Sequence, residues 1–95
     1  MLNQVILVGR LVEIKEEGKK AIITLAVPQS FQNVDGEYDT NYIECILFGS
    51  VAKNTIEYCK KGDVIGIKGR IQRLGEEPMG IIAEKVTFLA SSKGE

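Results

Sequence analysis

The stretch from residue 41 to residue 71 reads Asn-Tyr-Ile-Glu-Cys-Ile-Leu-Phe-Gly (41–49), Ser-Val-Ala-Lys-Asn-Thr-Ile-Glu-Tyr-Cys (50–59) and Lys-Lys-Gly-Asp-Val-Ile-Gly-Ile-Lys-Gly-Arg-Ile (60–71). The pattern predicts a strand, a short helix and a second strand. Residues of the first strand alternate between two faces, with Ile43, Cys45 and Leu47 on one and Tyr42, Glu44, Ile46 and Phe48 on the other. Because the second face also carries aromatic and apolar groups, it needs a partner, either stacked bases or another protomer.

The composition limits the class of protein. Ninety-five residues form one domain with one modest core, and 44% of them are hydrophobic. The net charge of −1 excludes a strongly basic nucleic-acid binder, so any surface for anions must arise by local clustering of cations. The chain has no apolar run of about 18 residues, and its start lacks the basic region of a signal peptide. We therefore expect a cytoplasmic protein that does not enter membranes.

The residues that usually carry catalysis or metal binding are few. The chain has two cysteines and no histidine, which cannot complete a four-ligand zinc site. Cys45 lies on the apolar face of its strand. Cys59 lies on the apolar stripe of the helix, which also holds Val51, Ala52, Thr55 and Ile56. Both cysteines are therefore expected to be buried thiols in a reducing compartment. The acidic pairs at 16–17 and 76–77 fall in turns, which is not a positioned acid–base pair. We expect no metal, no cofactor, no catalytic residue and no enzymatic activity.

The remaining sequence adds three further strands. Strands are predicted over residues 3–14, 20–28, 42–48, 63–73 and 79–89. Gly9 inside the first strand indicates a bulge or a close backbone approach, and Pro28 ends the second strand before a polar loop over 29–40. Ser50 is the expected helix N-cap, and Lys60 and Lys61 the expected cationic end of the helix.

This order of elements predicts an all-β fold with one short helix. It is an OB-fold, a five-stranded Greek-key barrel with the helix between strands three and four, over residues 1–90. Residues 91–95 form a short polar tail. An SH3-like barrel would not need the helix, and a split α+β sheet would need a second one.

Six segments in order support a more specific reading: residues 1–11, 23–27, 46–49, 60–62, 69–71 and 86–89. With these segments the chain resembles the bacterial single-stranded DNA-binding protein family. The resemblance implies a homotetrameric OB-fold protein, nucleoid-associated, that coats single-stranded DNA with little sequence preference during replication, recombination and repair. Family members usually end in an acidic tail that recruits replication and repair proteins. This sequence departs from that pattern at Ser-Ser-Lys-Gly-Glu, and we expect either a naturally short form or a truncated one.

The resemblance places base-stacking rings at Phe31 and Tyr42 and a DNA-contacting ring at Phe48. Tyr38, in the same loop as Phe31, is a fourth candidate for stacking. The hairpin at 74–78 is short and lacks the aromatic found in many family members. Tyr58 and Phe88 are instead expected to pack against the protein.

Cations that alternate on outward faces are candidates for contact with DNA phosphates. The set is Arg10, Lys15, Lys53, Lys68, Arg70 and Arg73. Glu44 opposes this function unless it pairs with Lys68, Arg70 or a cation of another protomer. Residues 5–8 are apolar on both strand faces, which predicts a homo-oligomer, most simply a tetramer, with a dimer as the alternative.

Two other functions remain open at this point. One is a primosome-type OB adaptor, a small dimer that acts mainly through protein partners. The other is an RNA-binding OB protein, because stacking alone does not distinguish the two sugars.

Overall fold

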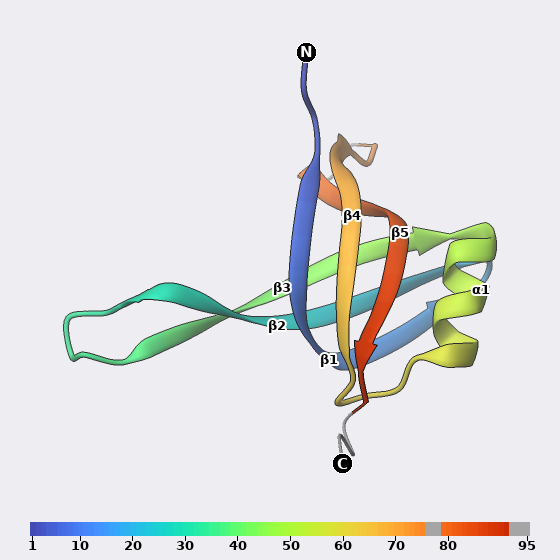
Figure 1. Cartoon of the computed structure of the whole chain (residues 1–95). Coiled ribbons are helices and arrows are strands. Elements are labelled where there is room, and N and C mark those ends of the chain that lie inside the picture. The colour runs from blue at the N-terminus through green and yellow to red at the C-terminus, as the bar shows by residue number, and fades with distance from the viewer. Residues whose placement is uncertain (76–78, 92–95) are drawn as a thin grey trace.

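The computed structural model of the chain describes residues 1–75 and 79–91. Its elements, in order, are β1 (Val5–Glu17), β2 (Lys20–Gln32), β3 (Tyr38–Phe48), α1 (Gly49–Tyr58), β4 (Val64–Arg73) and β5 (Met79–Ala90). The strands close into a barrel in the order β1-β2-β3-β5-β4, with α1 beside one end (Figure 1). The predicted OB-fold, including the position of the helix, is confirmed. The tail expected at 91–95 lies outside the described residues except for Ser91.

Strand β1 closes the barrel because it pairs with two neighbours. Residues 5–10 pair with β4 and residues 10–17 pair with β2, with a register shift between Leu11 and Glu13. Gly9 allows the strand to pass close to β2, since a Cβ built on it would lie 2.7 Å from the carbonyl oxygen of Ala26. Of the two roles predicted for Gly9, the structure therefore shows the close approach, and the bulge falls three residues later at Val12.

The core fills the barrel with aliphatic side chains from every strand and from α1. The largest fully buried groups are Leu11, Ile23, Leu25, Leu47, Ile65 and Ile67. Ala52 and Thr55 of α1 are buried at the end of the barrel. Cys45 and Cys59 are both buried and both free thiols, as predicted. The apolar stripe read from the sequence of the helix is thus the face that packs on the barrel.

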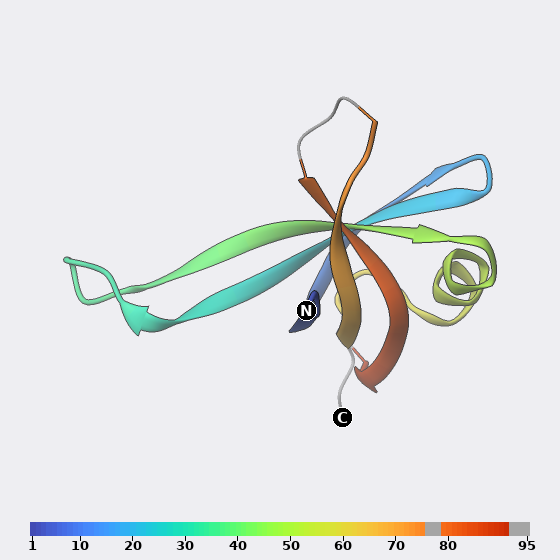
Figure 2. The same ribbon diagram turned by 90° about the horizontal axis from the view of Figure 1, so that it is seen from above.

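The hairpin of β2 and β3 is longer than the sequence predicted. Figures 1 and 2 both show it projecting from the barrel. Pairing continues through Pro28 to Gln32 and Tyr38, with an irregular register between Pro28 and Gln32. The loop shrinks to residues 33–37 because the Asn33 side chain stabilises a tight tip. Its Oδ1 accepts the backbone N–H groups of Asp35 and Glu37, at 2.9 and 3.0 Å.

The start of α1 differs from the prediction. Ser50 is the second residue of the helix rather than its cap, and the capping position is Phe48, which makes no side-chain capping bond. Gly49 takes a positive φ of 57°, and its N–H donates to the carbonyl of Lys19 at 3.3 Å. A direct turn from strand to helix through glycine therefore replaces the polar cap.

The end of α1 also differs from the prediction. The helix ends at Tyr58, and Lys60 and Lys61 lie beyond it. This turn is fastened to β1, because the N–H of Gly62 donates to the carbonyl of Leu11 at 2.6 Å. The two lysines are therefore part of a connection held by the barrel and not of the last helical turn.

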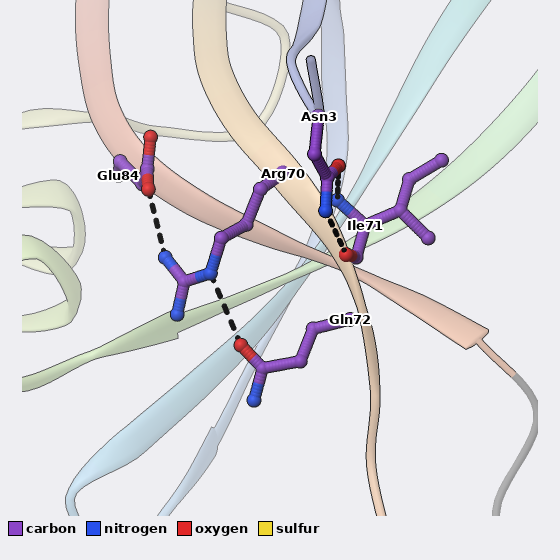
Figure 3. Close-up of polar contacts among 5 residues, drawn as sticks. All are labelled: Asn3, Arg70, Ile71, Gln72 and Glu84. Atoms are coloured by element: carbon purple, nitrogen blue, oxygen red, sulfur yellow. Dashed lines mark hydrogen bonds and ion pairs between the residues drawn. The ribbon is translucent and has the colours of Figure 1, made fainter. Parts of the chain in front are cut away.

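Ile71, Tyr58 and Phe88 are large side chains that are exposed. Ile71 shares strand parity with the buried Ile65 and Ile67 but is 47% exposed, because β4 and β5 continue past the barrel end. Its backbone is held by the Asn3 side chain, which accepts its N–H at 2.9 Å and donates to its carbonyl at 2.8 Å (Figure 3). Tyr58 and Phe88, predicted to pack, are 69% and 49% exposed. The hairpin expected at 74–78 lies partly outside the described residues, and the acidic pair at 76–77 lies entirely outside them.

Candidate nucleic-acid interface

The outward side of β3 carries the two aromatic rings expected there. Tyr42 is 68% exposed and Phe48 is 48% exposed, and between them lie the exposed Glu44 and the half-buried Ile46. Cys45 and Leu47, which alternate with these residues, are fully buried. The predicted alternation of this strand is confirmed.

Strand register extends this surface across β2 and β1. Residues directly opposite each other in antiparallel strands share a face, which gives the cross-strand rows Tyr42–Ala26–Arg10, Ile46–Ile22–Lys15 and Phe48–Lys20–Glu17. We call these three rows, together with the row Glu44–Thr24–Glu13 that lies between them, the aromatic face. Rings and aliphatic groups on β3 are therefore followed, one or two strands away, by cations. A strand of nucleic acid needs this combination of stacking groups and phosphate partners.

An acidic row crosses the middle of the aromatic face. The bulge in β1 places Glu13 opposite Thr24, and Thr24 lies opposite Glu44. Sequence reasoning found Glu44 but missed Glu13, since the register shift that turns Glu13 outward has no clear signal in the sequence. Two carboxylates separated by one threonine repel phosphates at this position and leave room there for groups that donate hydrogen bonds.

The other two predicted stacking rings lie on the projecting hairpin. Phe31 is 65% exposed near the end of β2, and Tyr38 is 60% exposed at the start of β3. Gln32, next to Phe31, pairs with Tyr38, so both rings lie close to the tip. They belong to strands rather than to the loop predicted for them, which holds their backbones in a regular ladder.

The predicted cations do not form one track. Lys68 lies opposite Ile6 of β1 and Lys85 of β5, on a side of the barrel that does not contain the aromatic face. Arg73 lies opposite Met79, where β4 and β5 extend past the barrel. Strand order decides this separation, because β4 is not a neighbour of β3 in the barrel.

Arg70 is already paired. Its Nη1 donates to Oε2 of Glu84 at 2.8 Å, and its Nε donates to the Gln72 side chain at 3.0 Å (Figure 3). The guanidinium therefore has a carboxylate partner of its own, and the pairing of Glu44 with Arg70 that the sequence suggested is not present. Across the described residues, the Glu44 side chain makes no hydrogen bond or ion pair, which leaves its carboxylate open on the aromatic face.

Lys53 joins a second cationic group that sequence reasoning missed. Lys19, Lys20 and Lys53 line a cleft of about 360 Å³ between the β1–β2 turn and the start of α1. Lys20 lies opposite Phe48 and has its Nζ 3.9 Å from Oε1 of Glu17. The cleft therefore adjoins the Phe48 end of the aromatic face. Sequence spacing did not suggest it, because Lys53 is more than 30 positions from the turn.

Arg10 occupies the opposite end of the aromatic face. Its guanidinium donates from Nη1 to the carbonyl of Gly62. This bond anchors the side chain while the remaining N–H groups of a guanidinium still suit a phosphate. Lys15 is exposed, with neither a hydrogen bond nor an ion pair to the residues that the structure describes.

The thiols are unsuited to chemistry or metal binding at neutral pH. Burial raises the pKa of Cys45 from 9.0 to about 11. The pKa of Cys59 is raised by burial and, secondarily, by the negative charge of Asp63. A protonated thiol is a poor nucleophile and a poor metal ligand. Within residues 1–75 and 79–91, no three metal-ligating side chains gather. No helix in that part of the chain is long and apolar enough to cross a membrane.

Comparison with known proteins identifies related chains. Residues 2–88 match the profile of the Single-strand binding protein family. The chain is 44% identical over 78 residues to single-stranded DNA-binding protein B of Bacillus subtilis (strain 168), covering 76% of this chain and 69% of that protein. It is 35% identical over 107 residues to single-stranded DNA-binding protein 3 of Listeria innocua serovar 6a, covering 98% of this chain and 67% of that protein. The fold matches a small single-stranded DNA binding protein from Mycoplasma pneumoniae with a TM-score of 0.74 at 22% identity, over 90% of this chain and 92% of that one.

Proposed function

Since the chain belongs to the single-strand binding protein family, we propose that it binds single-stranded DNA on the aromatic face with little overall sequence preference. Tyr42 and Phe48 stack on bases, and Arg10 and Lys15 contact phosphates. Lys53, with its neighbours in the cleft beside Phe48, extends the phosphate path. Binding rather than catalysis is the activity.

One observation carries this proposal. The two rings exposed on β3 lie on the same barrel surface as cations from β1 and β2, in register. Exposed aromatic side chains cost solvation free energy unless something covers them, and bases cover them without regard to sequence because every base has a π-face. Phe31 and Tyr38 on the projecting hairpin offer further stacking surface along the same strands.

The test is a fluorescence anisotropy titration with oligo-dT of about 30 nucleotides at low salt, with duplex DNA and oligo-U as competitors. Preference for oligo-dT over both is expected. Absence of binding to oligo-dT at low salt would overturn the proposal. Equal competition by oligo-U would favour an RNA-binding protein instead. A role in replication, recombination and repair in the cytoplasm belongs to the same proposal, because single-stranded DNA arises there in those processes.

We further propose that the protein is a homo-oligomer, most simply a tetramer, with β1 at an interface. Ile6 and Val8 are 68% and 53% exposed on the outward side of β1, and Leu89 is 50% exposed nearby. Gly66, opposite Val8, leaves this surface flat, and the Leu89 side chain passes over it. An apolar patch of this kind on a monomer is typical of an interaction surface.

Light scattering distinguishes the states. A mass of four chains at micromolar concentration is expected, and an Ile6→Glu, Val8→Glu double variant is expected to give smaller species. A monomeric mass for the unmodified chain would contradict the proposal. The dimeric adaptor alternative predicts two chains and weak binding to oligo-dT.

A further inference from the structure

A cleft opens on the aromatic face between the two stacking rings. Its volume is about 640 Å³, and its walls come from β2, β3, the start of β5 and Leu74, which directly follows β4. That volume lies within the range of pockets that enclose a small organic group. The floor is formed by apolar residues. Gly80 lies between Leu74 and Ile46, and a Cβ built on it would lie 2.8 Å from Leu74 Cδ1 and 3.7 Å from Ile46 Cδ1.

The polar groups of this cleft lie on two sides of an aliphatic platform. Ile22 and Ile46 are opposite each other and form the middle row. Glu44 belongs to the next row on one side and Lys20 to the next row on the other. Rows two residues apart along a strand are separated by about 7 Å. A flat ring resting on the two isoleucines therefore has a hydrogen-bond acceptor at one edge and a donor at the other.

The arrangement of donor and acceptor favours guanine over thymine. A carboxylate accepts hydrogen bonds and donates none, whereas an ammonium only donates. The Watson–Crick edge of guanine presents N1–H and N2–H side by side as donors, and its Hoogsteen edge presents the acceptors O6 and N7. That pattern suits a carboxylate that accepts both N–H groups at one edge and an ammonium that approaches O6 from the N7 side at the other. Thymine presents a single donor between two carbonyl acceptors, which a carboxylate repels.

We propose that this cleft is a guanine-preferring subsite within an otherwise non-specific interface, with Glu44 accepting from N1–H and N2–H and Lys20 donating to O6. The inference rests on the proposed function, since it concerns one position along the bound strand. It also gives Glu44 a role on a surface where phosphates alone would disfavour it. The base covers Ile22 and Ile46, and Met79, which is 60% exposed, lies at the rim.

The test compares 12-mers of thymidine that carry one central substitution, measured by competition anisotropy at fixed salt. The single-dG oligomer is expected to bind about fivefold more tightly than all-dT. This is the low end of the discrimination that a bidentate contact to a base provides. Deoxyinosine, which lacks the N2 amino group, is expected to lose most of this gain. One guanine per strand also prevents self-association of the probe.

Two matched variants assign the preference to Glu44. Glu44→Gln is expected to abolish the dG preference while binding all-dT more tightly at low salt, because a repulsive charge is removed. Glu13→Gln removes the other carboxylate of the same row, and Glu13 does not line the cleft. This variant is therefore expected to keep the dG preference. Equal affinity of the unmodified protein for dG and dT oligomers, or a preference that persists in Glu44→Gln, would overturn the inference. Failure to bind all-dT would instead overturn the proposed function.

Discussion

Salt dependence of binding tests whether the structure assigns the phosphate contacts correctly. Each phosphate contact on single-stranded DNA contributes about 0.7 to the slope of log K against log salt. Lys15 lies on the aromatic face and Lys53 in the adjoining cleft, so Lys15→Gln and Lys53→Gln should each make the slope shallower by about 0.7. From about 50 to about 200 mM salt, one contact changes K by about 2.6-fold. Over that range the affinity of the unmodified protein should therefore fall by a factor about sevenfold larger than that of the double variant.

Lys68→Gln is the control for this prediction. It removes the same charge from an exposed strand residue, but Lys68 lies among β1, β4 and β5 and away from the rings. Its slope should equal that of the unmodified protein when oligo-dT affinities are measured at four or more salt concentrations. A slope reduced by Lys68→Gln as much as by Lys15→Gln would refute the assignment, and would mean that the bound strand passes over β4.

Three further outcomes are expected. Tyr42→Ala and Phe48→Ala should each weaken oligo-dT binding by about 1–3 kcal/mol. The melting temperature should change little, because both rings are largely exposed. If either variant instead unfolds the protein or dissociates the oligomer, the aromatic face is a contact between subunits and not a surface for bases. Gly69→Ala should lower the free energy of unfolding, measured by urea denaturation, by about 3 kcal/mol or more. The reason is that the added Cβ would lie 2.1 Å from the backbone oxygen of Ile82. A urea midpoint equal to that of the unmodified protein would contradict this. Burial raises the pKa of Cys45 from 9.0 to about 11, so the unfolded chain loses this proton first. The contribution of Cys45 to stability should be complete below pH 9 and fall as pH rises toward 11, by about 1.4 kcal/mol per pH unit at most. Cys45→Ala should make the slope of stability against pH shallower, leaving the part due to Cys59, whose pKa is also raised; an unchanged slope would contradict this.

The sequence alone determined the elements and the two sides of β3. Alternation from Tyr42 to Phe48 correctly separated buried from exposed residues, because side chains of a strand change face at every residue. The stripe through Ala52 and Thr55 correctly marked the packed side of α1. These inferences depend only on neighbours a few positions apart, and local backbone geometry decides them wherever the chain folds. Element ends were less well predicted: Asn33 holds a tight turn, so β2 and β3 run further than Pro28 suggested.

Only the tertiary structure decided which charges share a surface. Whether Lys68 lies near the rings depends on strand order, and whether Arg70 is available depends on Glu84, which comes from β5. Glu13 turns toward Thr24 because of a single bulge. Ile71 is apolar yet exposed, since it lies where β4 and β5 extend beyond the barrel. Tyr58 and Phe88 are exposed along a cleft between α1 and β5 that the packing of the helix leaves open. These contacts join residues distant in sequence through the closure of the barrel, and closure is a property of all five strands together, which no local pattern of residues specifies.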